Sequence, residues 1–476
     1  MVHAYEPSPW MILPFGTLLA VIALAPLLFA EWWGRHYAKV AFTLGLVTVG
    51  YYLCVLPSAA HAKVLGTAEE YFSFICLIGS LYVVSGGIHI SVKGEATPWE
   101  NVRFLLIGAV IANLLGTTGA SMLLIRPWIR MNKYRITSHH IVFFIFIVAN
   151  VGGCLTPIGD PPLFLGYLKG IPFFWVITHC WAIWLVGVGT LLAMFYFVDR
   201  RNYQRAPKPV REHLAEPGDH WRFDGLANLV FLGAILGAVF ISHPPFVREG
   251  IMIAAALGSW FTTKEPIHKA NHFTWHPLQE VAILFLGIFA TMMPALDWLE
   301  NNAATLNQPG VALFFWGSGT LSSILDNAPT YLSFLSAALG KFVPGDAVQQ
   351  MQTLLATGIP AQAAFSGPHA EGLRNTLLAL QQYHAGDLAT RQVTLDEIKI
   401  CYLLGNANLN AFIVAISAGS VFFGANTYIG NGPNFMVKAI ADHQKVHTPG
   451  FIGYVFKYTL PFMLPVLVLI WLIFFR

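Results

Sequence analysis

Charged residues are scarce in this sequence. They make up 11% of its 476 residues, against roughly 25% in a soluble domain, whereas hydrophobic residues make up 56%. A soluble protein of this length would need far more polar surface to cover itself, so the composition excludes that class. Apolar runs of roughly 20 residues, long enough to cross a bilayer, recur along the whole chain. The chain is therefore predicted to be an integral membrane protein.

Long basic runs and cysteine pairs are also missing. The net charge is only +3, which gives no sign of a nucleic-acid partner. The five cysteines lie apart in apolar segments, which fits small buried residues better than disulfides or a metal site. The first apolar block, 10–30, has no basic region before it and no small-residue cleavage site after it. It is predicted to be a spanning helix rather than a removable signal peptide.

Apolar blocks separated by polar breaks predict an all-α polytopic membrane protein with about ten spanning helices. Regular spans are expected at 10–30, 38–56, 70–90, 172–198, 226–242, 247–261, 279–298 and 451–475. Four further blocks are irregular. Blocks 103–126 and 311–338 carry polar and small residues at mid-length, and blocks 139–168 and 408–441 are cut by Gly and Pro.

The distribution of Lys and Arg predicts the orientation. Basic residues collect in the connections 126–135 and 199–224, which are therefore expected to be cytoplasmic. Because the connection before block 103–126 is also basic, that block is predicted to be a re-entrant hairpin. Counting outward places the N-terminus outside, together with the segment 339–398. This segment is predicted to be a surface cap or a set of interfacial helices, with a regulatory ligand site as the alternative.

The irregular blocks match in pairs. The run Thr117-Thr118-Gly119-Ala120-Ser121 aligns with Asp326-Asn327-Ala328-Pro329-Thr330, and 156–162 aligns with 427–433 through the pattern T-x-I-G-[D/N]-x-P. The two offsets, 209 and 271 residues, differ by 62, which is close to the length of the insertion 339–398. These matches predict an inverted repeat, with halves at 1–198 and 226–476 and a cytoplasmic linker at 199–225. Each half then holds one re-entrant hairpin and one broken helix.

Two hairpin tips and two breaks are expected to meet near the middle of the membrane and form one binding site. Broken backbone is tolerated at that depth only where protein or water satisfies its hydrogen bonds. Helix C-termini suit cations, and helix N-termini suit anions. The residues predicted to line this site are Thr117, Thr118, Thr156, Gly159, Asp160, Asp326, Asn327, Thr427, Gly430 and Asn431.

Asp160 and Asp326 are the strongest functional signal, because a carboxylate at membrane depth is costly and usually functional. The alternative for each is a structural Asp bonded to backbone amides. His89, His139 and His140 lie near the ends of apolar blocks, where interfacial anchoring is favoured over proton relay. Asn150, Asn408 and Asn410 are candidates for bonds between helices.

At these residues the sequence resembles the ion transporter superfamily. Thr156 to Pro162 is similar to the T-P-I-G-T-P-P motif of divalent anion:sodium symporters, with Asp160 in place of Thr. Ile158 to Pro162 and Asp326-Asn327 also resemble the arsenite-efflux and P-protein branch, and Gly424 to Lys438 looks like the putative citrate transporter or sodium:proton antiporter subgroup. The resemblance implies a homodimer in which a transport part moves against a scaffold by an elevator-like motion.

The residue chemistry favours a cation as the cargo. Asp160 and Asp326 stand at matched positions, with no Lys or Arg at either tip or break. Two carboxylates would repel citrate unless sodium or protons screened them, whereas burial makes a carboxyl group easier to protonate. The predicted function is therefore sodium/proton antiport by alternating access, with Asp160 and Asp326 as ion and proton carriers. The alternative is sodium-coupled symport of citrate or a dicarboxylate.

Other classes fit less well. The chain contains no HExxH or GxSxG motif, so an intramembrane enzyme is not expected, and matched inverted breaks favour alternating access over a passive channel. No cofactor is expected beyond transported Na⁺ and H⁺. The expected partners are the lipid bilayer and small ions or a small organic anion, and the simplest location is a bacterial inner membrane.

Overall fold

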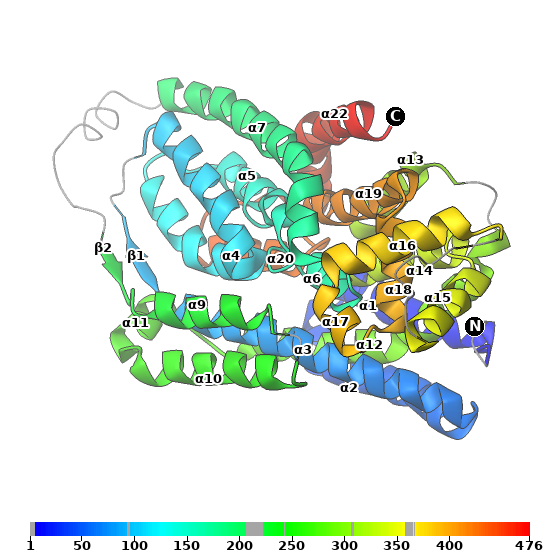
Figure 1. Ribbon diagram of the computed structural model, residues 1–476. Helices are drawn as coiled ribbons and strands as arrows, with labels where there is room; N and C mark the ends of the chain where they lie inside the picture. The colour runs from blue at the N-terminus through cyan, green and yellow to red at the C-terminus, as the bar shows by residue number, and fades with distance from the viewer. Residues whose placement is uncertain are drawn as a thin grey trace.

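The structure is a computed structural model that describes residues 5–92, 96–205, 222–241, 243–305, 309–357, 365 and 367–476. Nearly all ordered elements in these ranges are helices (Figure 1). Within them, nine helical segments are long and apolar enough to cross a membrane. The predicted all-α polytopic membrane fold is thereby confirmed.

Four helices of the first half, α2, α3, α4 and α7, have 25 residues or more. In chain order the elements are η1 (Pro9–Ile12), α1 (Leu13–Leu28), α2 (Ala30–Cys54), η2 (Ser58–Ala60), α3 (His61–Gly86), β1 (His89–Ser91), α4 (Pro98–Met131), α5 (Ser138–Ile147), η3 (Val151–Leu155), α6 (Pro161–Leu168) and α7 (Phe173–Arg205). Helices α2 and α3 begin earlier than the predicted spans at 38 and 70. Their first turns carry polar residues, such as Glu31 and Lys63, that hydropathy alone assigns to connections.

The second half begins with two helices that are short for a membrane crossing. In chain order the elements are β2 (Arg222–Asp224), α9 (Asn228–Ala238), α10 (Val247–Thr262), α11 (Glu265–Ala270), α12 (His276–Asn302), η4 (Ala303–Thr305), α13 (Val311–Ser322) and α14 (Asn327–Phe342). They continue with α15 (Gly345–Thr357), α16 (Ala370–Tyr383), α17 (Ala385–Thr390), α18 (Leu395–Leu404), α19 (Ala407–Phe423), η5 (Gly424–Asn426), α20 (Gly432–His443), α21 (Phe451–Tyr454), η6 (Val455–Met463) and α22 (Leu464–Phe474). At about 1.5 Å per residue, α9 and α10 are shorter than the bilayer core, although 226–242 and 247–261 were predicted as full spans.

Helix α4 is folded back on itself, as expected for the hairpin 103–126. Gly116 has a φ of 72°, a left-handed conformation that glycine adopts without steric cost. The two ends of α4 meet, because the Ala96 amide donates to the Met131 carbonyl over 2.9 Å. The matching block 311–338 is divided between α13 and α14, which are separate helices joined at Ser323 to Asp326.

Both Gly- and Pro-containing blocks are interrupted helices. In 139–168, α5 ends at Ile147 and α6 starts at Pro161, with the short turn η3 between them. In 408–441, α19 ends at Phe423 and α20 starts at Gly432, with η5 between them. Proline stands in the first turn of α6 and of α20, where its missing amide donor costs no helical hydrogen bond.

The segment 339–398 holds the helices α15, α16 and α17, and α18 follows at its end. These helices have a small hydrophobic core of their own, built from residues such as Met351, Leu373, Leu380 and Ile398. The predicted amphipathic stretch 373–383 lies in α16, whose buried residues Leu373, Leu377 and Leu380 recur at helical spacing. The segment therefore forms a helical cap beside α14 and α19.

The strand pair β1 and β2 is the one sheet in the described residues and was not predicted. His89 is opposite Asp224 and Ser91 is opposite Arg222 in antiparallel register. This pair joins the end of α3 to the start of the second half. The rest of the predicted linker, 206–221, lies outside the described residues.

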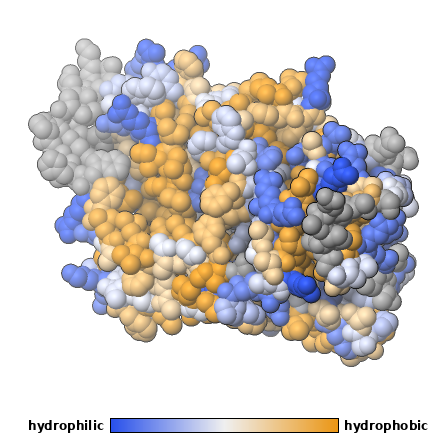
Figure 2. Space-filling view, viewed as in Figure 1, coloured by the Kyte–Doolittle hydropathy of each residue, from blue (hydrophilic) through white to orange (hydrophobic). Residues whose placement is uncertain are grey.

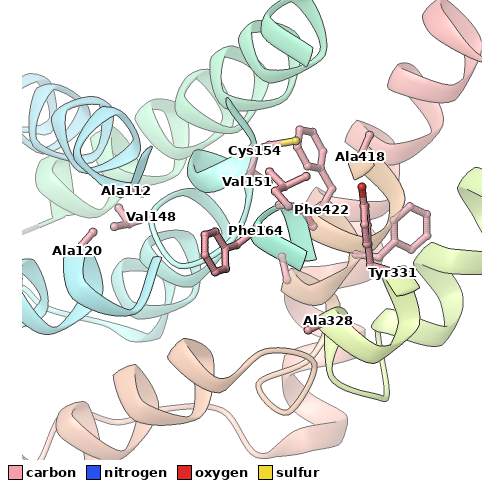
Figure 3. Packing of buried hydrophobic residues seen from close by; sticks show 14 of the residues in the cluster. Ala112, Ala120, Val148, Val151, Cys154, Phe164, Ala328, Tyr331, Ala418 and Phe422 are labelled. Atoms are coloured by element: carbon pink, nitrogen blue, oxygen red, sulfur yellow. The ribbon is translucent and has the colours of Figure 1, made fainter. Parts of the chain in front are cut away.

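Hydrophobic side chains cover much of the surface in Figure 2, as lipid contact requires. The main core is continuous across both halves of the chain. Figure 3 shows Val151, Cys154 and Phe422 together, with Phe164 of α6 on one side and Ala328 and Tyr331 of α14 on the other. The two breaks and the two hairpins thus share one packed centre.

Candidate functional site

Asp160 lies at the centre of the molecule, at the point where the first broken helix restarts. It is the N-cap residue of α6 and its side chain has no exposed surface. Pro161 and Pro162 follow it, so the backbone cannot continue the preceding turn as a regular α-helix. The sequence therefore fixes a carboxylate at the positive end of a short helix inside the protein.

The carboxylate of Asp160 is held by side chains from both halves. Thr117 of the first hairpin donates to Oδ1 over 2.6 Å, and the Asn431 amide of the second break donates to the same oxygen over 3.3 Å. Asn327, at the start of α14 in the second hairpin, donates to Oδ2. All three donors are neutral. Two tips and two breaks therefore meet at one carboxylate.

The two breaks share the same local hydrogen bonds. The Gly159 amide donates to the Thr156 hydroxyl over 3.0 Å, and the Gly430 amide donates to the Thr427 hydroxyl over 3.0 Å. Each threonine in turn donates to a hairpin carbonyl. Thr156 bonds Asn113 over 2.6 Å, and Thr427 bonds Ser323 over 2.7 Å. The matched sequence motif thus builds a matched turn in each half.

Glycine is required within these turns because the backbone passes closely. A Cβ atom on Gly159 would lie 2.1 Å from the Gly153 carbonyl oxygen, and one on Gly430 would lie 2.7 Å from that of Gly424. Both approaches are closer than real Cβ contacts allow. The two glycines therefore position the backbone and supply no side chain to the site.

Three asparagines support the site: Asn113 and Asn434 were not named from the sequence, whereas Asn150 was named as a candidate for bonds between helices and makes one. Asn113 donates to the Gly152 carbonyl over 2.7 Å and accepts from the Leu155 amide over 2.9 Å. Asn150 donates to Asn434 over 2.6 Å, and Asn434 donates to the Thr427 carbonyl over 3.0 Å. Asn113 and Asn150 each lie in the middle of an apolar block, and such a buried side-chain amide indicates a hydrogen bond inside the protein.

Asp326 and Thr118 flank this centre. Asp326 is half-buried and caps α14, because its Oδ1 accepts from the Ala328 amide over 3.1 Å. It has the structural bond that the sequence left open as an alternative. Thr118 is half-buried beside Thr117 and lines a cavity. The exposed Asn408 contributes nothing to the centre.

A small cavity lies between α3 and the first-half tip and break. Its free volume of about 20 Å³ holds roughly one water molecule. Asp160 is the one carboxylate among the fifteen described residues that line it, and none of them is Lys or Arg. The other polar lining comes from Thr117, Thr118 and Tyr82. In this conformation the space is the size of one water molecule.

One buried oxygen beside Asp160 has no hydrogen-bond donor. Asn327 donates to Asp160 through Nδ2, whereas its own Oδ1 is buried without a partner. A buried oxygen left without a donor costs about 1–3 kcal/mol. A bound cation or a proton on Asp160 would satisfy it.

A second buried carboxylate, Asp199 of α7, has a different environment. Arg135 binds both of its oxygens, and His139 and His140 lie 3.4 and 3.0 Å from Oδ1. The two histidines therefore belong to an internal ion-pair cluster and are not interfacial anchors as predicted. His89 is half-buried, and its Nδ1 lies 2.8 Å from Asn271 Oδ1. Neither group contacts Asp160.

A polytopic helical fold with a carboxylate held between two interrupted helices defines a membrane transporter. Comparison with known proteins agrees with this class. The chain matches the family described as "Putative citrate transport" over residues 4–475, and it belongs to that family. It is also 23% identical over 285 residues to "Inner membrane protein YbiR" of Escherichia coli (strain K12), which covers 56% of this chain and 72% of that protein. The chain is therefore a secondary transporter of the ion transporter superfamily.

Proposed function

We propose that this transporter exchanges sodium for protons at Asp160 by alternating access. The observation that carries the proposal is the full burial of the Asp160 carboxylate among three neutral donors, Thr117, Asn327 and Asn431. A buried carboxylate without a cationic side-chain partner needs either a proton or a metal cation to balance its charge. One group that accepts either, but not both at once, is the simplest exchanger.

The donor groups of the site are already used by the protein's own carboxylate. Hydroxyl and amide donors at helix N-termini are the groups that would bind a substrate carboxylate. Here Thr117, Asn327 and Asn431 donate to Asp160, so an anion would have to displace it. The cavity beside Asp160 is also of water size. Both features favour a small cation.

Sodium would find oxygen ligands close to Asp160. The carboxylate, the Asn327 Oδ1 atom and the Thr118 hydroxyl stand around the site, together with the carbonyls that the two breaks release. Hard cations of this kind prefer such oxygens. When a proton replaces sodium, Asp160 becomes a donor, and the Asn327 amide can turn its oxygen toward it. Asp326, at the N-terminus of α14, would add negative charge nearby.

The test uses the purified protein in liposomes with a pH-sensitive dye inside. The membrane potential is first collapsed. An external sodium pulse should then alkalise the interior, because sodium enters in exchange for protons. With the sodium gradient reversed, the interior should acidify. Asp160→Asn should abolish the response, and Asp160→Glu should retain part of it. Asp346→Asn in the cap, where the side chain is 61% exposed, is the matched control and should behave as the unchanged protein.

The second candidate is sodium-coupled citrate symport, which the family description favours. Four helix N-termini also converge at the centre, those of α6, α14, α20 and the second arm of α4, and such ends stabilise anions. Labelled citrate entering the same liposomes only in the presence of sodium, without a pH response to sodium alone, would replace antiport by symport.

A further inference from the structure

His384, Asp387 and Glu397 lie together in the cap. His384 follows α16, Asp387 lies in α17 and Glu397 lies in α18. One ligand atom from each residue lies within 4.8 Å of the other two. All three side chains are largely buried, with exposed fractions of 11%, 17% and 15%.

The imidazole of His384 is oriented by the backbone. Its Nε2 lies 3.0 Å from the Gly170 carbonyl oxygen, which can only accept a hydrogen bond, so Nε2 carries the proton. Nδ1 is left facing the two carboxylates, 3.3 Å from Glu397 Oε1 and 3.6 Å from Asp387 Oδ2. Histidines that bind a metal through one ring nitrogen usually donate the N–H of the other nitrogen to a carbonyl or carboxylate oxygen.

The two carboxylates are also held in place. Glu397 accepts from the Thr394 amide through Oε2 over 2.7 Å, as part of the capping box of α18, and this leaves Oε1 for His384. Both oxygens of Asp387 have a histidine neighbour. His243 Nε2 lies 3.0 Å from Oδ1, and His384 Nδ1 lies 3.6 Å from Oδ2. His243 comes from the connection between α9 and α10 and is half exposed.

The spacing is compatible with a tetrahedral metal site. Ligand atoms at zinc distances of about 2.0–2.1 Å are separated by roughly 3.4 Å in a tetrahedron. The separations of 3.3 and 3.6 Å are close to that value, whereas 3.6 Å is too long for a hydrogen bond. Imidazole with carboxylate ligands suits zinc and similar divalent transition metals.

The charge around the cluster favours a cation. Two carboxylates, those of Asp387 and Glu397, face the single imidazole of His384. The neighbouring ammonium of Lys169 is neutralised by Glu70 and Asp396, at 2.5 and 3.2 Å. The Asp199 cluster, by contrast, already contains the Arg135 guanidinium and has no such need.

We propose that His384, Asp387 and Glu397, with His243 as the fourth ligand, bind one divalent transition-metal ion such as Zn²⁺. The ligands come from the start of α17, from α18 and from the connection after α9. His384 also donates to the carbonyl of Gly170, which follows α6. The ion therefore fastens the cap to the rest of the transporter. This site is independent of whether sodium, protons or citrate pass through the centre.

The test is binding of Zn²⁺ and Co²⁺ to the purified full-length protein in detergent, after treatment with a chelator. We expect one Zn²⁺ per chain by calorimetry, a tetrahedral Co²⁺ absorption spectrum, and a rise in melting temperature with added Zn²⁺. Glu397→Gln should weaken binding at least about tenfold while keeping the α18 capping box, because Gln serves at that position too. Asp387→Asn should weaken it similarly.

The matched control is His369→Gln in the same cap. His369 Nε2 lies 3.0 Å from Asp346 and takes no part in the cluster, so this variant should bind as the unchanged protein does. Absence of Zn²⁺ binding, or equal binding by Glu397→Gln and the unchanged protein, would overturn the proposal and leave the cluster as an ion pair of protonated His384. Because the readout is binding, failure of the proposed sodium/proton exchange would not affect it.

Discussion

The carboxylate of Asp160 accepts a hydrogen bond from the side-chain amide of Asn327, although 167 positions separate the two residues. Asp160 begins α6 of the first half, and Asn327 begins α14 of the second. The two helices also pack directly, because a Cβ atom on Gly166 of α6 would lie 2.4 Å from the Tyr331 hydroxyl of α14. A change in the charge of Asp160 therefore alters hydrogen bonds to residues of both halves, Thr117 and Asn327.

Replacing Asn327 by Ala should weaken sodium binding. The change removes a donor to a charged acceptor, a bond worth about 1.5–3 kcal/mol, and also removes the unpartnered Oδ1 oxygen. We expect the sodium concentration for half-maximal exchange to rise by about 10–100-fold, since 1.4 kcal/mol is a factor of ten. Asn408→Ala is the control, because Asn408 is exposed and is not among the donors to Asp160. Unchanged sodium dependence in Asn327→Ala would remove Asn327 from the site.

Replacing Asp326 by Asn separates its two possible roles. Asn is as good an N-cap residue as Asp, so the bond to the Ala328 amide and the melting temperature should be kept. If the carboxylate also carries charge in the cycle, as we propose, sodium-driven exchange should fall at least about tenfold while folding is unaffected. Full activity in Asp326→Asn would restrict Asp326 to capping α14.

The sequence was sufficient to predict the interrupted helices and that Asp160, Thr117, Asn327 and Asn431 come together. Proline and glycine act on their own backbone, so Pro161 and Gly159 reveal the break without any knowledge of packing, whereas the turn at Gly116 was not named from the sequence. The T-x-I-G pattern repeats because both halves build the same turn around Thr156 and Thr427. Features that depend only on neighbouring residues, such as these breaks and turns, can be predicted from a single sequence.

Contacts between distant residues were not predictable in the same way. Asp199 and Arg135 are 64 positions apart, and each looks like an ordinary polar residue at the end of an apolar block. The strand pair β1 and β2 joins three-residue segments that have no period to recognise. The metal-ligand cluster in the cap combines residues from three elements, which only the packing of α16, α17 and α18 brings together.

Replacing Asp199 by Asn should destabilise the protein strongly. The Arg135 side chain is 4% exposed, so the variant would leave a buried guanidinium without its carboxylate, at a cost of about 3–5 kcal/mol. The double variant Asp199→Leu with Arg135→Met removes both charges and should recover most of the lost stability. Thermal unfolding in detergent measures both. A double variant no more stable than Asp199→Asn would show that the charges themselves are needed.

Replacing Gly166 by Ala should disturb the contact between α6 and α14. A Cβ atom at position 166 would lie 2.4 Å from the Tyr331 hydroxyl and 3.0 Å from its Cζ atom, so one helix must shift. Overpacking of this kind costs about 1–3 kcal/mol. Because the same two helices carry Asp160 and Asn327, sodium affinity should fall together with stability. Gly189→Ala is the control, since nothing lies within 4 Å of a Cβ there.

Tyr331→Phe tests whether the hydroxyl is the cause of the effect at position 166. The hydroxyl is the closest atom to the added methyl group, so its removal should relieve most of the clash. The pair Gly166→Ala and Tyr331→Phe should then be more stable than the sum of the two single variants predicts, with a coupling of about 0.5–3 kcal/mol. Strict additivity would mean that α6 and α14 do not meet at these residues, and the short path from Asp160 to Asn327 would lose its structural support.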